Sequence, residues 1–560
     1  MAGIFALFRS VVRGLPLTFQ PLRPTMSPSR FVALLLVAAA LPAAAPAQQR
    51  RQPQRAAEQA RDTTPRPAPN RESPSDTTVQ RVTTQHSVVI GGQRIEYDAT
   101  VGDIILRDSA NEPIGALYFT AYIKRGVTDP SHRPITFAYN GGPGSSSVWV
   151  HMGAFGPKRV VTPDTTHAPP PPYQLVDNAY SPLDKTDLVF IDPIGTGFSH
   201  PLGKATGKMF WGVDEDVRSL SQFISRYLTE QDRWNSPRYL LGESYGTTRS
   251  AALVNYLQQA DNMDFNGVIL MSSVLDFQTI TFDPGNLMPY VLYLPSYAAV
   301  AWYHKVLPDQ PAQLRPFLKE VEHFATTDYL HALMQGDDLP PDERARIIEQ
   351  LHKYTGLDTG YIDRANLQVD APEFEKELLR EHGEVIGRLD ARFTGPTFDM
   401  LAQRSPYDPQ SSSISSAFVS TFQTYLHTDL NFPRDKQYMV SGNVNPWNWQ
   451  HGRRGGWPGH TNVAVDIAQA LQLNPHLHVL LNSGLFDLAT PYYAAEWTFD
   501  QMDLPKNLRG HVQFAEYDAG HMMYVYEPSL AKLKENIASF IDATSGVNGT
   551  AGRVATSTSK

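Results

Sequence analysis

Short apolar runs alternate with amphipathic segments along most of the chain. Alternating apolar and polar positions first predict strands within residues 93–108 and 113–126. Later apolar runs end in loops with unusual chemistry, and they predict further strands within residues 133–140, 186–193, 237–244, 266–273, 476–484 and 511–521. Helical periodicity at residues 214–228, 247–259 and 461–473 lies between them. This order predicts a mostly parallel sheet covered on both faces, with ligands bound beyond the carboxyl ends of the strands.

One segment interrupts this rhythm. From residue 282 to residue 435 the chain carries charged helical patterns and a Pro/Ser-rich stretch, "SPYDPQSSSISS". Because strand patterns resume after it, we interpret residues 282–435 as a helical cap inserted into a catalytic domain of residues 86–281 and 436–545. An independent helical domain is the alternative interpretation.

The N-terminus has the pattern of an export signal. A basic start at Arg30 is followed by an apolar run and then by small residues that end at Ala47. We expect a signal peptide over residues 1–47, with Met26 as an alternative start, and a periplasmic or secreted protein. A single membrane anchor is the alternative, although the apolar run is short for spanning a bilayer.

Composition marks the ends of the chain and narrows the function classes. Residues 48–85 are rich in Gln, Arg, Pro and Thr and predict a disordered linker, and residues 546–560 predict a disordered tail. The chain has no cysteine, which excludes disulfides, zinc–thiolate sites and a thiol nucleophile. Its net charge of −9 argues against nucleic acid as a partner. Nothing in the sequence indicates a metal, an organic cofactor, stable membrane insertion after signal removal, or an oligomeric state.

The stretch "GESYG" predicts a nucleophilic serine. Gly242, Ser244 and Gly246 fit the pattern Gly-x-Ser-x-Gly, in which glycines permit a sharp strand-to-helix turn that presents the serine hydroxyl. The flanking apolar run is typical of a strand and the following segment of a helix. An ordinary turn with an unreactive serine is the alternative interpretation of this motif alone.

A serine nucleophile needs a general base and an acid that orients it. Asp487 and His521 follow the last two predicted strands, so parallel strands would place both beside Ser244. Asp518 is a competing acid, but its position three residues before His521 favours a role in the turn.

The loop "NGGPGSSS" can supply backbone donors for an oxyanion, because its glycines leave N–H groups unobstructed. A phosphate-binding loop is the competing interpretation. It is disfavoured because the Lys-Ser/Thr ending is absent and Pro143 removes a donor.

Five stretches in order, "NGGPGSSS", "IDPIGTGFS", "GESYGTT", "GLFDLATP" and "AGHMMY", resemble the serine carboxypeptidase family of α/β-hydrolases (the carboxypeptidase C and cathepsin A type) over residues 86–545. The resemblance implies an α/β-hydrolase fold, with a mostly parallel sheet, flanking helices and a helical cap. It implies Ser244 as nucleophile, Asp487 and His521 as its partners, and the N–H groups of Gly142 and Tyr245 as the oxyanion hole.

The resemblance also gives Glu243 a role in substrate binding. In that family the glutamate before the serine acts with the Asn-Gly of the glycine loop to bind the C-terminal carboxylate of the substrate, which implies Asn140, Gly141 and Glu243 here. A carboxyl group can do this only while it is protonated, so acidic pH is favoured.

This sequence departs from the family pattern at three positions. Ala138 replaces a tryptophan, and Ser145 replaces a cysteine, so the usual disulfide is impossible. Ala154 stands where the family has a second glutamate that is hydrogen-bonded to the first. His151 lies close in sequence to Ala154 and is a candidate cation for the carboxylate, although a structural role is the commoner one for a lone histidine.

The sequence therefore predicts an exported serine peptidase that acts on peptides or proteins and releases C-terminal residues through an acyl-enzyme. An exported aminopeptidase of the same fold that removes short N-terminal peptides is the nearest alternative. An esterase or acyltransferase is another, and a non-enzymatic binding module is the contrasting class.

Overall fold

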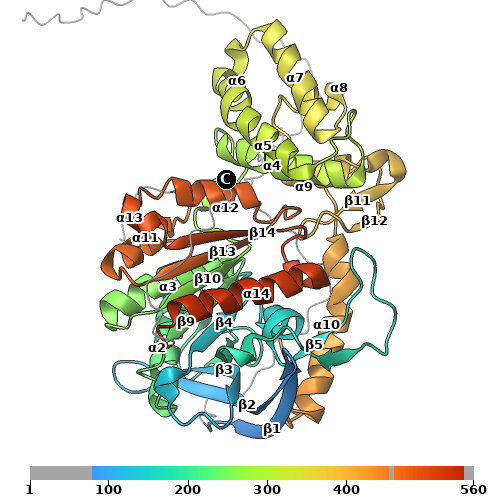
Figure 1. The fold of residues 1–560 in the computed structure, drawn as a ribbon. Helices are drawn as coiled ribbons and strands as arrows, with labels where there is room; N and C mark the ends of the chain where they lie inside the picture. Colours follow the sequence, from blue (N-terminus) through green and yellow to red (C-terminus); the bar gives the residue numbers. More distant parts are fainter. Residues whose placement is uncertain (1–77, 453–458, 548–560) are drawn as a thin grey trace, which may run out of the picture. The chain divides into compact units, whose positions relative to one another are not determined.

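A ten-stranded sheet lies at the centre of the fold (Figure 1). Its strand order is β1-β2-β3-β7-β4-β9-β10-β13-β14, with β8 paired to β3. The strands are β1 (Arg81–Ile90), β2 (Gln93–Arg107), β3 (Pro113–Lys124), β4 (Ile135–Tyr139), β7 (Asp187–Ile191), β8 (His200–Pro201), β9 (Arg238–Glu243), β10 (Gly267–Met271), β13 (His478–Gly484) and β14 (Val512–Tyr517). From β7 to β14 neighbouring strands are parallel, and β1, β2, β3 and β8 pair antiparallel. The predicted α/β-hydrolase sheet is thus confirmed.

The computed structural model describes residues 78–452 and 459–547. The expected signal peptide, most of the expected linker and nearly all of the expected tail lie outside these residues and stay predictions. Within the described ranges, no helix combines the length and the apolar character that crossing a membrane requires.

The start of the folded region differs from the sequence prediction. Strand β1 begins at Arg81, inside the stretch 48–85 that was expected to be linker, so that boundary is wrong by a few residues. Each residue of β1 pairs with one of β2, from Arg81 with Gly102 to Ile90 with Gln93. A two-residue turn with positive φ at both glycines joins the strands and aligns this register. β1 was not recognised as a strand in the sequence because it is rich in polar residues, and half of these face solvent at the edge of the sheet.

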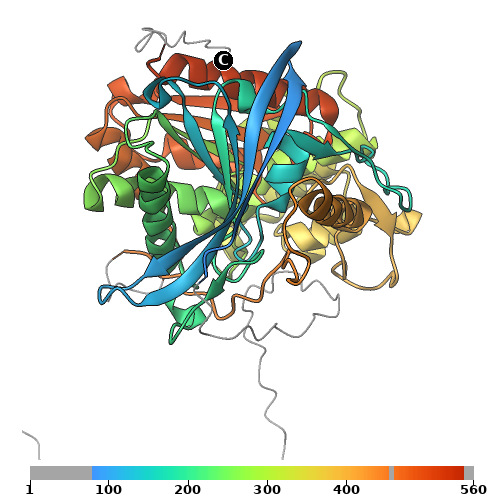
Figure 2. The ribbon, with the colours of Figure 1, turned by 90° about the horizontal axis from the view of Figure 1, so that it is seen from below.

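Apolar residues alternate between the two faces of the sheet and form two cores. On one face, Phe137, Leu240 and Val268 pack with α2 (Val213–Glu230), α3 (Tyr245–Ala260) and α11 (Ala464–Leu473). On the other face, Ala138, Leu241 and Ile269 lie in one core with α10 (Pro409–Thr428) and α14 (Glu527–Thr544) (Figure 2). Full cover on both faces explains why the central strands are continuously apolar.

The segment between β10 and β13 contributes to two different cores. Six of its helices share a core of their own with Phe486 and Leu488, which follow the carboxyl end of β13 (Figure 1). These helices are α4 (Met288–His304), α5 (Leu314–Phe324), α6 (Leu330–Gln335), α7 (Pro341–Thr355), α8 (Thr359–Arg364) and α9 (Ala371–Glu377). Helix α10 also falls within the predicted insertion, but it packs on the core of the sheet instead.

The remaining elements are short. Two small antiparallel sheets pair β5 (Lys158–Val160) with β6 (Leu175–Asp177) and β11 (Glu384–Ile386) with β12 (Thr394–Pro396). The short helices are α1 (Val148–Val150), α12 (Tyr492–Asp500) and α13 (Lys506–Arg509).

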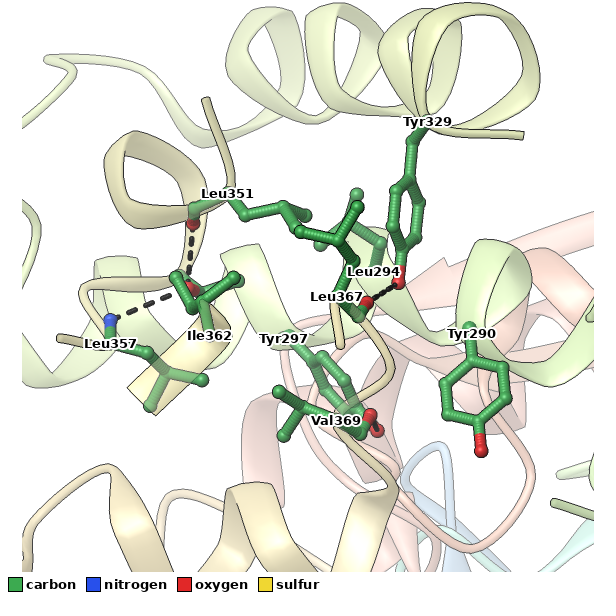
Figure 3. Close-up of a pocket in the computed structure, with 10 residues that line it drawn as sticks. Tyr290, Leu294, Tyr297, Tyr329, Leu351, Leu357, Ile362, Leu367 and Val369 are labelled. Carbon is green, nitrogen blue, oxygen red and sulfur yellow. Dashed lines mark hydrogen bonds between the residues drawn. The ribbon is translucent and has the colours of Figure 1, made fainter. Parts of the chain in front are cut away.

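A small cavity lies inside the core of α4–α9 (Figure 3). Its volume of about 20 Å³ has room for about one water molecule. Two of its tyrosine hydroxyls are already bound to backbone carbonyls, Tyr329 to Leu367 and Tyr297 to Val369. The cavity is a packing gap and offers no ligand site.

A buried ion pair joins the helices of one face to the loop after β4. Arg249 of α3 has no exposed side-chain surface, and its Nε donates to Asp216 Oδ2 of α2 at 2.6 Å. Its Nη1 donates to the carbonyl oxygen of Asn140 at 2.8 Å. The guanidinium also lies over the rings of Tyr139 and Tyr245. Arg249 therefore ties α2 and α3 to the loop that follows β4.

Replacement of Arg249 should destabilise the fold more than removal of the whole pair. We expect Arg249→Leu to lower the free energy of unfolding by about 3–5 kcal/mol, because Asp216 stays buried without its partner. The double variant with Asp216→Leu should recover part of this loss. Urea unfolding of the three proteins tests this, and a double variant less stable than Arg249→Leu alone would contradict it.

Candidate active site

Ser244 occupies a sharp turn between β9 and α3. Its φ of 60° and ψ of −131° lie in a region that non-glycine residues rarely adopt. The turn is held by close packing, because a Cβ on Gly242 would lie 2.1 Å from the carbonyl oxygen of Gly246. Ser244 N donates to the carbonyl of Met271 at the end of β10, at 3.0 Å. The side chain is partly exposed although both neighbours are buried, so the strained turn presents the hydroxyl at the surface.

Asp487 and His521 form a hydrogen-bonded pair. Asp487 follows β13 and is fully buried, and its Oδ2 lies 2.8 Å from Nδ1 of His521, which follows β14. The N–H groups of Ala489 and Thr490 donate to Asp487 Oδ1 at 2.8 and 2.9 Å. The Thr490 hydroxyl donates to Oδ2 at 2.8 Å. The carboxylate is therefore held in one orientation toward the imidazole.

Two opposing effects act on the pKa of His521. Burial of the ring lowers it, but the charge of Asp487 and the hydrogen bond to it raise it, and the net pKa lies above the ordinary value of histidine. Asp487 therefore stabilises the imidazolium cation that forms when His521 accepts a proton.

Two hydrogen bonds at the end of β10 link the turn of Ser244 to the loop of His521. Met271 accepts from Ser244 N, and the hydroxyl of the next residue, Ser272, donates to the carbonyl of His521 at 2.7 Å. Strands β9, β10, β13 and β14 are neighbours in one parallel sheet, so the loops that carry Ser244, Asp487 and His521 leave the same edge. Asp518 takes no part, because its side chain is 69% exposed and pairs with Arg315.

The glycine loop after β4 lies against the start of α3. A Cβ on Gly141 would be 2.4 Å from Tyr245 N and 2.5 Å from Gly246 N. Gly142 is exposed and has a φ of 104°. Tyr245 is the first residue of α3, so its N–H has no partner within the helix. The glycine loop and the start of α3 therefore lie close together, and the oxyanion role of Gly142 and Tyr245 stays a prediction.

A hydrogen bond joins the side chain of Asn140 to that of Glu243, the residue before Ser244. Asn140 Nδ2 donates to Glu243 Oε1 at 2.7 Å, and Asn140 Oδ1 accepts from Val150 N at 3.0 Å. Glu243 is only 3% exposed, and burial raises its pKa to about 7, against the opposing influence of His521. The carboxyl group is therefore protonated over much of the acid-to-neutral range, although Ala154 supplies no second carboxyl.

His151 does not reach this site as a cation. Its Nε2 lies 2.6 Å from the Tyr122 hydroxyl, and its ring stacks on Phe190. Burial lowers the pKa of His151 to about 3, so the imidazole is neutral, which agrees with the structural role favoured from the sequence and not with the alternative of a cation.

Residues 388–390, within the predicted insertion, make contacts with the site that the sequence patterns did not predict. Leu389 O accepts from His521 N at 2.6 Å, and Arg388 O accepts from Leu488 N at 3.0 Å. Asp390 Oδ2 accepts from Gly520 N at 3.0 Å. Residues 388–390 therefore hold the acid loop and the base loop together. No signal in the sequence pointed to them, because they lie far along the chain from every motif.

The described residues contain no group of three or more histidine, aspartate or glutamate side chains arranged to hold a metal ion.

Comparisons with known proteins point to one family. The model of the family described as serine carboxypeptidase matches residues 109–534. Serine carboxypeptidase-like 45 of Arabidopsis thaliana is 26% identical over 34% of this chain and 39% of its own length. The pheromone-processing carboxypeptidase KEX1 of Yarrowia lipolytica is 28% identical over 34% of this chain and 28% of its own. The chain thus spans less than half the length of these two relatives.

A solved structure shows the same fold. The crystal structure of a prohormone-processing carboxypeptidase from Saccharomyces cerevisiae superposes with a TM-score of 0.50 and 16% sequence identity. The superposition covers 80% of this chain and 91% of that one.

Gly141→Ala tests the arrangement of the glycine loop. The added methyl group has no room beside Tyr245 N, so the loop or the start of α3 must shift and misplace the two donors. We expect labelling by a fluorophosphonate to slow about 100-fold, while circular dichroism shows a folded protein. Gly510→Ala is the matched control, because a Cβ there meets open space. Labelling of Gly141→Ala at the wild-type rate would show that the loop forms no oxyanion site.

Proposed function

This chain belongs to the serine carboxypeptidase family, and from that premise we propose that it is a serine peptidase that releases C-terminal residues from peptides. The observation that carries the proposal is the strained, partly exposed Ser244 at the same edge of the sheet as the hydrogen-bonded Asp487–His521 pair. Support also comes from the glycine loop against the start of α3.

The proposed reaction begins with proton transfer. Because Asp487 accepts from Nδ1 of His521, the other ring nitrogen, Nε2, is left free to take the proton of the Ser244 hydroxyl. The oxygen attacks the scissile carbonyl, and the N–H groups of Gly142 and Tyr245 bind the oxyanion. His521 returns the proton to the leaving amine, which departs and leaves an acyl-enzyme. Water, activated by the same imidazole, then releases the acyl product and restores Ser244.

Recognition of a free C-terminus is assigned to Asn140, Gly141 and Glu243. A protonated Glu243 can donate a hydrogen bond to the terminal carboxylate of a peptide, whereas an ionised one repels it. Its pKa of about 7 supports this role without a second carboxyl. Asn140 holds Oε1 as an acceptor, which leaves Oε2 as the position of the proton.

We also propose that the protein is exported and acts on peptides or proteins outside the cytoplasm. The support is the signal-like pattern of residues 1–47 together with an acidic folded part. Helices α4–α9, which contact the loop after Asp487, are proposed as the cap over the site.

Ser244→Ala should remove catalysis without unfolding the protein. We expect hydrolysis to fall by about 10⁴-fold or more, with complete loss of fluorophosphonate labelling. Mass spectrometry of a digested peptide should show successive losses from its C-terminus with the wild type. Losses from the N-terminus would identify an aminopeptidase, and turnover of acyl esters without trimming would identify an esterase.

Two aspartates provide a matched comparison for the same assay. Asp487→Asn should abolish trimming, whereas Asp518→Asn should retain it, because Asp518 is exposed and paired with Arg315. Persistent labelling of Ser244→Ala, or equal loss in both aspartate variants, would contradict the proposed roles.

Glu243→Gln tests how the C-terminal carboxylate of the peptide is bound. In the wild type, Glu243 ionises as pH rises through about 7, so kcat/KM on free-carboxylate peptides should fall about 15-fold between neutral pH and a pH about 1.5 units higher. Glutamine stays neutral and still donates, so its alkaline decline should be much smaller. Rates on a blocked dipeptide and on its C-terminal amide measure this effect. Equally fast trimming by both proteins at acid, neutral and alkaline pH would show that Glu243 does not bind the carboxylate.

A further inference from the structure

The two carboxyl oxygens of Glu243 have different surroundings. Oε1 accepts from Asn140 Nδ2 at 2.7 Å. Oε2 is fully buried and has no hydrogen-bond partner among the residues in the described ranges. A buried polar atom without a partner lowers the stability of the folded protein by about 1–3 kcal/mol. Glu243 is the residue before the proposed nucleophile, so a group that pairs with Oε2 would stabilise this part of the site.

Tyr524 supplies a second unpaired polar atom in the same place. It lies three residues after His521, in the short helix η9 (Met523–Val525), and is 2% exposed. Its hydroxyl, like Glu243 Oε2, is buried and has no hydrogen-bond partner in the described part of the chain. The two groups influence each other, because the phenol lowers the pKa of Glu243 and the carboxyl raises the pKa of Tyr524.

The ring of Tyr524 is fixed by close packing. A Cβ on Gly153 would lie 2.5 Å from Cε2 of Tyr524 and 2.6 Å from Cδ2. Gly153 belongs to the π-helical turn η2 (His151–Phe155), which also contains Ala154. A glycine at this position therefore lets the phenol lie flat against the turn and keeps its hydroxyl near Glu243.

The charges around Glu243 come from three loops. His521, after β14, lowers the pKa of the carboxyl, and Asp487, after β13, raises it. Asn140, which donates a hydrogen bond to Oε1, and the phenol of Tyr524 also lower the pKa of Glu243. Burial raises the pKa of the Tyr524 phenol well above its ordinary value, so the hydroxyl keeps its proton and remains a donor at every working pH.

We propose that Tyr524 is the positioning residue for Glu243: its hydroxyl pairs with Oε2 of the buried carboxyl and sets the pH above which peptides ending in a free carboxylate are no longer bound. The part concerning substrate rests on the proposed function. Tyr524 acts through Glu243 and touches no reacting atom. A tyrosine that served only as packing would leave the protonation of Glu243 unchanged when its hydroxyl is removed.

Tyr524→Phe removes the hydroxyl and keeps the ring on Gly153. Without this donor the ionised carboxyl is less stable, so the pKa of Glu243 should rise by about one pH unit. Infrared difference titration reads this directly from the carboxylic acid band, which is assigned by its absence in Glu243→Gln. The alkaline limb of kcat/KM on a blocked dipeptide should move upward by the same amount, and Tyr524→Phe in the Glu243→Gln background should move neither reading.

Tyr517→Phe is the matched control. Tyr517 is equally buried on β14, and its hydroxyl bonds to Asn482 and Asn536, away from Glu243. A second variant guards against loss of folding: fluorotyrosine at position 524 keeps the shape and makes the hydroxyl a stronger donor. It should shift the carboxyl titration downward, opposite to Tyr524→Phe.

The outcomes separate the two proposals. If the infrared titration of Glu243 is the same in wild type, Tyr524→Phe and the fluorotyrosine protein, the positioning role is overturned. If the titration shifts as expected but the wild type releases no C-terminal residue, the proposed function fails while the pairing of Tyr524 with Glu243 stands. If both readings shift together, Tyr524 governs carboxylate binding.

Discussion

The backbone of Ser244 is the constraint on which the site depends. A positive φ at a serine costs about 1–3 kcal/mol, and here it is fixed by contacts that leave no room for relaxation. Gly242 packs against Gly246, and Gly141 packs against the N–H groups that begin α3. The same contacts that force the turn also bring the glycine loop to the start of the helix. One packing arrangement therefore exposes the hydroxyl and places the backbone donors beside it.

The ionisable groups next to Ser244 impose a second constraint on the site. Glu243 is buried next to a nucleophile, where a permanent negative charge would oppose an oxyanion, and burial resolves this conflict by favouring the neutral carboxyl. Asp487 raises the pKa of His521, and Glu243 raises it further when it is ionised. The proton affinities of base and carboxyl are thus coupled, and pH profiles of this protein report on the pair.

The sequence was most informative where chemistry and local geometry coincide. Apolar runs that end in glycine-rich or reactive loops predicted the parallel sheet, and their order along the chain placed Asp487 and His521 at one edge with Ser244. It was least informative for contacts between distant segments. Strand β1 was missed because half of its polar residues face solvent, and α10 packs on the sheet although its position in the chain suggested the cap. Tyr524 and residues 388–390 carry no motif, since their roles arise only from what folding places beside Glu243 and His521.

A crystal structure of the protein after reaction with a fluorophosphonate tests the central claim most directly. The account requires phosphorus bound to Ser244 Oγ, with one phosphoryl oxygen about 2.7–3.1 Å from the backbone nitrogens of both Gly142 and Tyr245. His521 Nε2 should lie within hydrogen-bond distance of the adduct. Phosphorus on another residue, or a phosphoryl oxygen directed away from both nitrogens, would contradict the assignment of nucleophile and oxyanion site.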